Sequence, residues 1–276
     1  MNRRTFLAGS VAGISAVLAG CTSRAGLQGE ARRTDDVTAE VDPGTTLRVD
    51  NRNGPVIVEG HDGDAVEVAI EITAPSSDAL DEVSVNVDET DDELRVETDY
   101  EDRTGFEWLF EWDRPSVAFT IRCPDDVPVG RVRTRNGSVE VTDVGGDPEI
   151  RSSNGKVTAQ NVDGTVSLST SNGRVTARDV AGLAGASTSN GAIDVDVPSI
   201  DGSVTIETSN GAIDAAIASD LDATVSASTT NGSVDIHDLD LSSVGTGRTD
   251  VEGTLGEGTH DLSIETTNGS IGLRPL

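Results

Sequence analysis

Large and reactive side chains are scarce in this sequence of 276 residues. Aromatic residues make up 3% of the chain, and none occurs after Phe119. There are two cysteines, and there is no Walker loop, zinc-ligand spacing, Gly-x-Ser-x-Gly elbow or dinucleotide-binding fingerprint. The sequence therefore predicts a thin interior of small side chains, and it predicts neither a cofactor nor a metal site.

Positive charge is also scarce. The chain has 20 Lys and Arg residues against 49 Asp and Glu residues, a net charge of −29. Without Arg3 and Arg4, assigned below to an export signal, the balance is 18 − 49 = −31. Such a charge repels phosphates and argues against nucleic-acid binding. Because patterned strands argue against disorder, the composition resembles that of a protein from a salt-loving archaeon, in which concentrated salt screens the repulsion between carboxylates.

The second half of the sequence is rich in one dipeptide, Asn-Gly. Successive pairs are separated by 18, 18, 18, 20, 21 and 37 residues, and we interpret 37 as two units with one pair missing. A nearly constant period of 18 to 21 residues is typical of a stacked array of one supersecondary unit. The pairs are Asn136-Gly137, Asn154-Gly155, Asn172-Gly173, Asn190-Gly191, Asn210-Gly211, Asn231-Gly232 and Asn268-Gly269.

Each unit contains two short alternating segments separated by turns. In the unit that begins at Asn154, Val157 and Ala159 alternate with polar residues, and Val166 and Leu168 do the same. This period of two predicts half-buried strands, and we expect Asn-Gly to supply the positive φ angles of tight turns. Equal unit length favours an all-β solenoid, or rolled β-helix, whose units stack as rungs; an antiparallel meander or sandwich is the alternative.

The N-terminus has the pattern of an export signal. Arg3 and Arg4 precede a short apolar run that ends in Leu18-Ala19-Gly20-Cys21. Paired arginines indicate twin-arginine export, and the last four residues resemble a lipobox, in which Cys21 becomes lipidated. We therefore predict a signal peptide over 1–20, a lipidated Cys21 with a flexible tether over 21–42, and one β-repeat domain over 43–276. The predicted location is the outer face of the cytoplasmic membrane, to which the lipid anchors the chain.

The repeat pattern is interrupted between residues 74 and 131. Three longer alternating segments near residues 83–87, 94–98 and 117–123 predict an antiparallel hairpin layer that caps one end of the solenoid. Cys123 lies on the apolar face of the last segment. No His lies near it in a local motif, so we expect a buried small side chain and not a nucleophile.

Four of the aromatic residues occur together inside this interruption. Phe106, Trp108, Phe110 and Trp112 alternate, so in a strand they lie on one face. They form either an exposed ledge that binds a glycan, an envelope partner or the lipid interface, or a buried plug at the end of the solenoid.

The segment from Asn51 to Gly60, the strand pair near 83–98, the run from Phe119 to Pro124 and the following Ser-Asn-Gly units together resemble the DUF4097 family of adhesin-like β-repeat proteins. The resemblance covers about residues 45 to 276. It implies a β-helical fold and a surface location, and it brings no catalytic residues. Members usually carry Ser-Gly-Asp turns where this sequence has Asn-Gly, and the stretch from Phe106 to Trp112 has no counterpart.

Two chemical alternatives remain at this point. Asp143, Asp163 and Asp179 recur late in successive repeats, as turn residues do, whereas a catalytic site of a β-helical carbohydrate-active enzyme interrupts a repeat at one place. Stacked Asp turns could also hold structural calcium, but the Gly-Gly-x-Gly-x-Asp motif is absent. The sequence therefore favours a non-enzymatic cell-surface lipoprotein, for adhesin-like display or as an envelope scaffold, whose partner is a glycan or an envelope protein.

Overall fold

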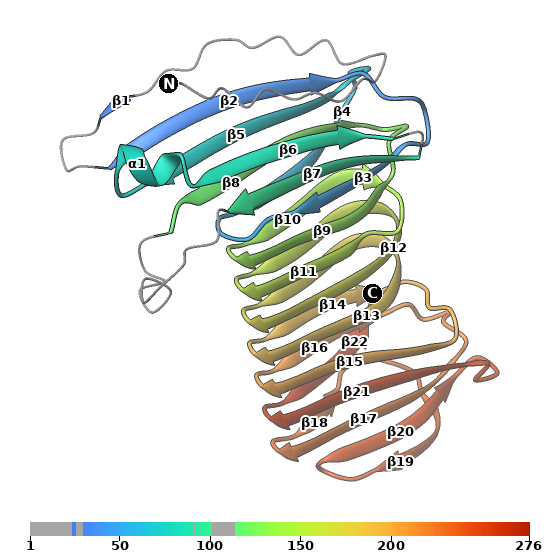
Figure 1. The fold of residues 1–276 in the computed structure, drawn as a ribbon. Helices are drawn as coiled ribbons and strands as arrows, with labels where there is room; N and C mark the ends of the chain where they lie inside the picture. Colours follow the sequence, from blue (N-terminus) through green and yellow to red (C-terminus); the bar gives the residue numbers. More distant parts are fainter. Residues whose placement is uncertain (1–23, 26–29, 91, 101–113) are drawn as a thin grey trace, which may run out of the picture.

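The computed structural model describes residues 24–25, 30–90, 92–100 and 114–276. They form an elongated stack of β-strand rungs with a curved layer of longer strands across one end (Figure 1). Each complete rung has a strand, a corner and a second strand. We call the two sides of the stack face A, which carries the strands before the Asn-Gly corner, and face B, which carries the strands after it. The predicted all-β, solenoid-like fold is confirmed.

Face A is one continuous sheet whose central strands pair in parallel. Antiparallel strands close it at both ends. From the N-terminal end, its spatial order is β6 (Val83–Glu89), β7 (Glu93–Tyr100), β3 (Thr46–Asp50), β9 (Val129–Asn136), β11 (Glu149–Asn154), the second halves of β12 (Val157–Asn172) and β13 (Val175–Asn190), β15 (Ser203–Asn210), β21 (His260–Asn268), β17 (Ala223–Asn231), β20 (Asp250–Leu255) and β19 (Ser242–Thr246).

Face B is also a continuous sheet with parallel central strands, and antiparallel strands extend it at its N-terminal end. The only helix among the described residues, α1 (Ser77–Leu80), lies beside that end. The parallel pairing of the repeats contradicts the alternative of an antiparallel meander. The spatial order of face B is β1 (Arg24–Ala25), β2 (Ala31–Ala39), β5 (Val66–Ala74), β8 (Ser116–Pro124), β4 (Val56–His61), β10 (Val139–Gly145), the first halves of β12 and β13, β14 (Ile193–Val197), β16 (Ile213–Ile217), β22 (Ile271–Pro275) and β18 (Val234–Ile236).

The core lies between the two faces as rows of small apolar side chains. On face B, Val139 is opposite Val157, which is opposite Val175, which is opposite Ile193. All four side chains are fully buried. Because copies of one repeat position stack directly on each other, residue volume is nearly constant along a row, and the interior stays thin, as the sequence predicts.

The C-terminal rung lies inside the stack and not at its end. Strand β21 pairs with β15 on one side and with β17 on the other, and β22 likewise pairs with β16 and β18. The chain therefore builds the rung of β17 and β18 first, folds back through the β19–β20 hairpin, and then inserts its last strands. Our interpretation of the spacing of 37 as a missing turn was wrong, because a hairpin and a reversal fill this interval. Figure 1 shows the C-terminus part-way along the stack.

The N-terminal end has the same kind of inversion. Strand β3 lies between β7 and β9, and β4 lies between β8 and β10. The interruption that follows β5 therefore does more than form the predicted hairpin layer. Strands β7 and β8 add a parallel rung outside the first one, and β6, β5, β2 and β1 then extend this rung in antiparallel fashion.

Residues Ala31–Ala39 differ from the tether that the sequence predicts. They form β2, which pairs antiparallel with the whole of β5, from Ala31 opposite Ala74 to Ala39 opposite Val66. Among the described residues, only the two-residue strand β1 lies beyond β2, so most of the outer edge of β2 has no strand partner there. The polar composition of β2 suits this position, because charged side chains discourage further pairing. In the part of the chain that the structure describes, no helix has the length and apolar character needed to cross a membrane.

Candidate functional site

The Asn-Gly corner is a ladder of amide side chains along one edge of face A. The Nδ2 of Asn154 donates to the Oδ1 of Asn136 at 2.8 Å, and the Nδ2 of Asn172 donates to the Oδ1 of Asn154 at 2.9 Å. The same bond, at 3.0 Å, continues the ladder in spatial order through Asn190, Asn210, Asn268 and Asn231. The seven rungs from Asn136 to Asn231 are thus tied to one another at the corner by side-chain hydrogen bonds as well as by the backbone.

The glycine of each corner is required for close backbone approach. A Cβ at Gly173 would lie 2.1 Å from the carbonyl oxygen of Gly155 in the rung before it. The φ angle lies in the left-handed region only at Gly54 and Gly137 among these corner glycines, and at none of the corner asparagines. Our expectation that Asn-Gly supplies positive φ was therefore wrong for most rungs, because stacking distance and not turn type excludes a side chain.

A buried hydroxyl two residues before each Asn completes the corner. The Oγ1 of Thr170 donates to the carbonyl oxygen of Gly155 at 3.0 Å, and Thr188 makes the same bond to Gly173 at 3.1 Å. The residue between the hydroxyl and the Asn points outward. Serine or threonine occupies this outward position in most rungs, at Ser153, Ser171, Ser189, Ser209, Thr230 and Thr267.

Two adjoining depressions follow this hydroxyl-rich part of face A, and within the described part of the chain no apolar side chain lines either of them. They share Thr170 and Ser187. The first, of about 540 Å³, is lined by Asp50, Asn51, Arg133, Thr134, Arg135, Arg151, Ser152, Ser153, Ser169, Thr170, Ser171 and Ser187. The second, of about 330 Å³, is lined by Thr170, Ser187, Thr188, Ser189, Glu207, Thr208, Ser209, Ser228, Thr230, Glu265, Thr266 and Thr267.

Basic side chains gather at the first depression. The arginine cluster consists of Arg131, Arg133, Arg135 and Arg151. Three of them share the carboxylate of Glu149: Arg131 Nε lies 2.8 Å and an Arg133 terminal nitrogen 3.2 Å from its Oε2, and Arg151 contacts its Oε1. Burial acts to raise the pKa of Glu149, but the hydrogen bond from Arg131 and the charges of Arg151 and Arg133 outweigh it and lower that pKa below its ordinary value. One ionised carboxylate thus faces three guanidinium groups.

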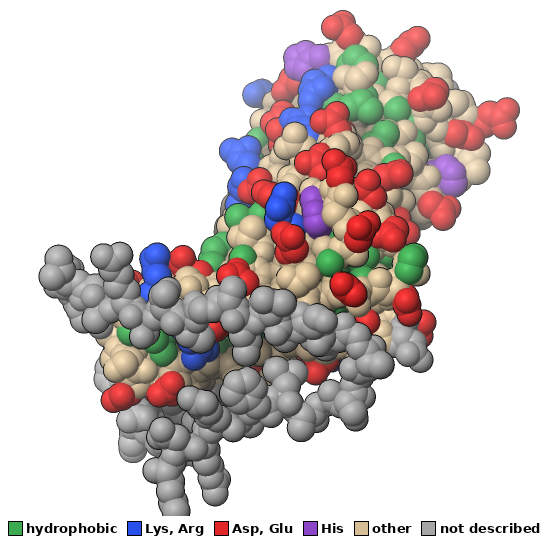
Figure 2. All heavy atoms as spheres, turned by 90° about the horizontal axis from the view of Figure 1, so that it is seen from above, with side chains coloured by type: hydrophobic (Ala, Val, Ile, Leu, Met, Phe, Trp, Pro, Cys, Tyr) green, Lys and Arg blue, Asp and Glu red, His purple; other side chains and the backbone are tan. Residues whose placement is uncertain are grey.

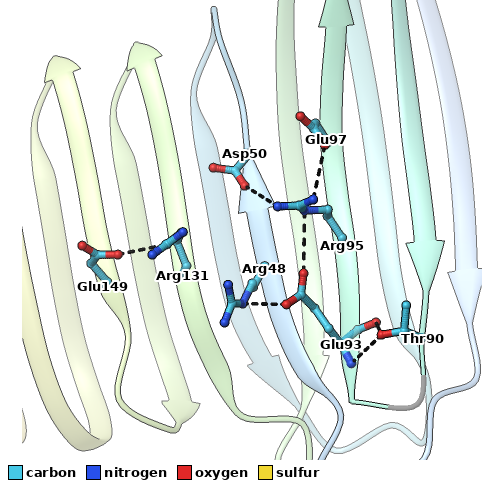
Figure 3. A network of polar contacts seen from close by, with 8 residues as sticks. All are labelled: Arg48, Asp50, Thr90, Glu93, Arg95, Glu97, Arg131 and Glu149. Atoms are coloured by element: carbon cyan, nitrogen blue, oxygen red, sulfur yellow. Dashed lines mark hydrogen bonds and ion pairs between the residues drawn. The ribbon is translucent and has the colours of Figure 1, made fainter.

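A second group of ion pairs borders the cluster on the N-terminal side (Figure 3). Arg48 Nε lies 2.9 Å from Glu93, and Arg95 lies within 4.0 Å of Asp50, Glu93 and Glu97. Here the carboxylates outnumber the guanidinium groups. Figure 3 shows Arg131 reaching Glu149 on the neighbouring strand, separate from this group. The excess of positive charge therefore belongs to the arginine cluster.

The comparisons with known proteins identify the family. The sequence matches the family described as Toastrack DUF4097 over residues 27–274. The chain belongs to the Toastrack DUF4097 family. None of the curated proteins matches it.

Solved structures similar to this Toastrack chain include a putative adhesin from Parabacteroides distasonis ATCC 8503, at 11% identity and a TM-score of 0.40, with 87% of this chain and 96% of that chain covered. A putative lipid binding protein from the same organism has 16% identity and a TM-score of 0.39, with 88% and 96% covered. A putative adhesin from Bacteroides fragilis NCTC 9343 has 13% identity and a TM-score of 0.36, with 87% and 96% covered.

Several residues singled out from the sequence fall outside the described part of the Toastrack chain. They are Arg3, Arg4 and Cys21 of the export and lipidation signals, and Phe106, Trp108, Phe110 and Trp112 of the aromatic stretch. Cys123 is buried, as predicted, and its Sγ donates to the carbonyl oxygen of Val127 at 3.3 Å. Burial, reinforced by the charges of Asp126 and Asp125, raises the pKa of Cys123 to about 12. The thiol is therefore protonated and unreactive at neutral pH.

The aligned aspartates have a conformational role. Asp143 and Asp179 have φ angles of 58° and 50°, and the residue between them in the stack is Asn161, with φ 51°. Asp163 lies two residues further on, opposite Gly145, so its predicted alignment with the other two was wrong. Asx residues tolerate this left-handed conformation. Among the described residues, no group of three or more His, Cys, Asp or Glu side chains is placed to hold a metal ion.

The arginine cluster of the Toastrack chain was missed in the sequence analysis. Arg131, Arg133 and Arg135 alternate within one strand, so they lie on one face. Arg151 follows Arg133 by 151 − 133 = 18 residues, one repeat, and the two are Cα partners. The period of two within the strand, combined with the period of the repeat, is the signal that predicts this cluster.

Proposed function

We propose that this protein is a non-enzymatic surface protein that is anchored by a lipid on Cys21 and presents face A to a polar partner outside the cytoplasmic membrane. The observation that supports it is the pair of adjoining, wholly polar depressions on face A. The carboxylates of the second depression, Glu207 and Glu265, are exposed on an open sheet, without the enclosed, water-poor surroundings that catalytic groups use. Asp50 of the first depression lies within 4.0 Å of Arg95, in an ion pair. These features support a binding surface in preference to a catalytic one.

The proposed anchor fixes the direction of the rod. Strand β1 begins at Arg24, three residues after Cys21. Three residues reach at most about 10 Å, so a lipid on Cys21 would hold the N-terminal cap close to the bilayer. The strands β17 to β20 then point outward, and face A stands along the side of the rod. A partner in the envelope or on a neighbouring cell reaches this face without contacting the membrane.

Anchoring is tested by cell fractionation. We expect Cys21→Ser to move the protein from the membrane pellet to the soluble extracytoplasmic fraction, because the lipid is lost. Cys123→Val is the matched control and stays in the pellet, since Cys123 is buried in the core. If Cys21→Ser remains in the membrane as firmly as the unchanged protein, the anchor is disproved.

A second contact is proposed at the aromatic stretch from Phe106 to Trp112, because its flanks lie at the Asn-Gly corner. Strand β7 ends at Tyr100 and β8 begins at Ser116. The carbonyl oxygen of Pro115 accepts from Tyr100 at 3.1 Å and from the Nδ2 of Asn53 at 3.0 Å. The described flanks of the stretch, Tyr100 and Pro115, thus lie beside the Asn53-Gly54 corner.

The emission of the two tryptophans tests this contact. Red-shifted, iodide-quenchable emission supports an exposed ledge that adds to face A. Blue-shifted, protected emission means that the aromatics are buried, and it would remove this contact from the proposal.

A further inference from the structure

We infer that the arginine end of face A binds an acidic glycan, a polymer that carries carboxylate or sulfate groups among neutral hydroxyls. The inference rests on the proposed function in one respect, since it names the partner of the displayed face. It is tested separately, because binding by the purified protein does not depend on anchoring in the cell.

The local charge of the first depression is opposite to that of the molecule. Three arginines and one aspartate line it, a balance of 3 − 1 = +2, in a chain whose net charge is −29. Figure 2 shows Asp and Glu side chains spread widely over the side of the molecule that it draws. In so acidic a chain, a cationic depression is a local concentration of positive charge and not a consequence of composition. An anion is the ligand that this concentration attracts.

The guanidinium groups are only partly satisfied by protein carboxylates. Arg131, Arg133 and Arg151 share Glu149. Arg135 is exposed, and no ion pair to it occurs within the described residues. A guanidinium group carries five N–H donors in a planar fork that matches carboxylate and sulfate oxygens. The cluster therefore retains donors for an external anion.

The rest of the depression selects a polyhydroxylated ligand. Its other lining residues, apart from Asp50 and Asn51, are serines and threonines. Exposed hydroxyl groups donate and accept, and they repeat along the stack at the strand spacing of about 4.8 Å. A sugar chain presents hydroxyls in both roles, whereas a lipid tail or an apolar peptide side chain needs an apolar pocket, which this lining does not offer.

An acidic protein strand fits this position less well. Strands β9, β11 and the second half of β12 are each paired on both sides. No backbone edge is free there for strand addition, which is how an extended peptide usually binds a sheet. Nucleic acid is also disfavoured, because the chain is strongly acidic and none of the described residues that line the depression is an aromatic on which bases could stack.

The negative charge of the second depression fixes the orientation of the ligand along face A. Glu207 and Glu265 give it a balance of −2, and they are Cα partners on neighbouring strands. An anionic ligand is therefore held at the arginine end and repelled from the other end. Its neutral portion extends over the hydroxyl groups between them.

Binding of the full chain, purified in detergent, to alginate and to heparin tests the inference, with neutral dextran and single-stranded DNA as comparison ligands. We expect Arg133→Gln/Arg135→Gln/Arg151→Gln to weaken binding of the acidic glycan at least about tenfold. The matched control, Arg174→Gln/Arg248→Gln/Arg274→Gln, removes the same charge from exposed residues outside the cluster, and it should change affinity less than about twofold. Tighter binding of heparin than of alginate would indicate that sulfate groups are recognised, because alginate carries carboxylates alone.

Removing the negative charge of the second depression should raise the affinity for the acidic glycan. Glu207→Gln/Glu265→Gln should strengthen binding by about twofold to fivefold at low salt, because it removes repulsion from the same face. No binding of either acidic glycan, equal losses in the cluster and control variants, or equally tight binding of DNA would each overturn the inference. Loss of membrane anchoring in the Cys21→Ser protein would leave these binding results unchanged.

Discussion

At the scale of single residues, three positions of each corner have different structural roles. The buried hydroxyl of Thr170 satisfies a glycine carbonyl, Asn172 extends the amide ladder, and Gly173 leaves room for the next rung. The repeated motif could be found in the sequence, but the reason for its glycine could not. A turn with positive φ and a close backbone approach both require Gly, and only the stacking distance distinguishes them.

The ladder glycines give a direct prediction. Gly173→Ala should lower the free energy of unfolding by about 2–3 kcal/mol or more, because its Cβ has to displace backbone atoms. The matched control is Gly245→Ala, since no atom lies within 4 Å of a Cβ built there. Thermal unfolding followed by circular dichroism measures both. Equal midpoints for the two variants would contradict the close-approach explanation.

Cys123 predicts a loss of stability at alkaline pH. Its pKa rises from 9.0 to about 12 on folding. Between these values the unfolded chain has released the thiol proton while the folded chain retains it, so the free energy of unfolding falls as the pH rises. Tyr100, whose pKa burial raises to about 12, contributes in the upper part of the same range.

The measurement is denaturant unfolding from pH 8 to pH 11, in the unchanged protein and in Cys123→Val. The variant keeps a buried side chain of similar size and removes the titrating group, so its stability should fall less steeply. Parallel curves for the two proteins would show that the thiol ionises equally well in both states.

At the scale of elements, the rungs and their order differ in how well they can be predicted. Alternation and the constant period indicate the strands and their parallel stacking, because both patterns are local. The order of the rungs is not local. Asn210, Asn231 and Asn268 follow the same motif, so any of the three corners can stack on another, and the insertion of β21 between β15 and β17 depends on contacts far apart in the chain.

The amide ladder predicts that substituting its asparagines has unequal effects on stability along the stack. Asn190 donates to Asn172 and accepts from Asn210, so it makes two ladder bonds. Asn231 ends the ladder and makes one ladder bond, to Asn268 at 3.0 Å, beside a longer bond of 3.5 Å to the carbonyl oxygen of Thr267. Asn190→Ala should therefore cost about 1–3 kcal/mol, roughly twice the cost of Asn231→Ala, at about 0.5–1.5 kcal/mol per bond. Urea unfolding gives both values. A larger effect at Asn231 would contradict the position of that residue at the end of the ladder.

At the scale of the whole molecule, the charge distribution sets the conditions in which the stack is stable. A net charge of −29 destabilises a compact chain through self-repulsion. Salt reduces the screening length from about 10 Å at 0.1 M to about 3 Å at 1 M. The midpoint of thermal unfolding should therefore rise steadily with potassium chloride concentration. An unchanged midpoint over this range would show that the carboxylates do not repel one another in the folded state.

Face A is a continuous surface only if the C-terminal rung occupies its inserted place. Glu265 of β21 is opposite Glu207 of β15 on one side and opposite Ser228 of β17 on the other. All three side chains are exposed. Neighbouring strands lie about 4.8 Å apart, within the Cα separation of about 4.4–6.8 Å that a disulfide spans, whereas strands two apart lie at about 9.6 Å.

The most direct test is disulfide formation in the full chain carrying Cys21→Ser and Cys123→Val. Glu207→Cys/Glu265→Cys and Ser228→Cys/Glu265→Cys should each form an intramolecular disulfide on mild oxidation, and Glu207→Cys/Ser228→Cys should not. Mass spectrometry of the non-reduced peptides reads out each pair. Efficient crosslinking of Glu207→Cys with Ser228→Cys would place β15 beside β17, and would contradict both the inserted rung and the surface built across it.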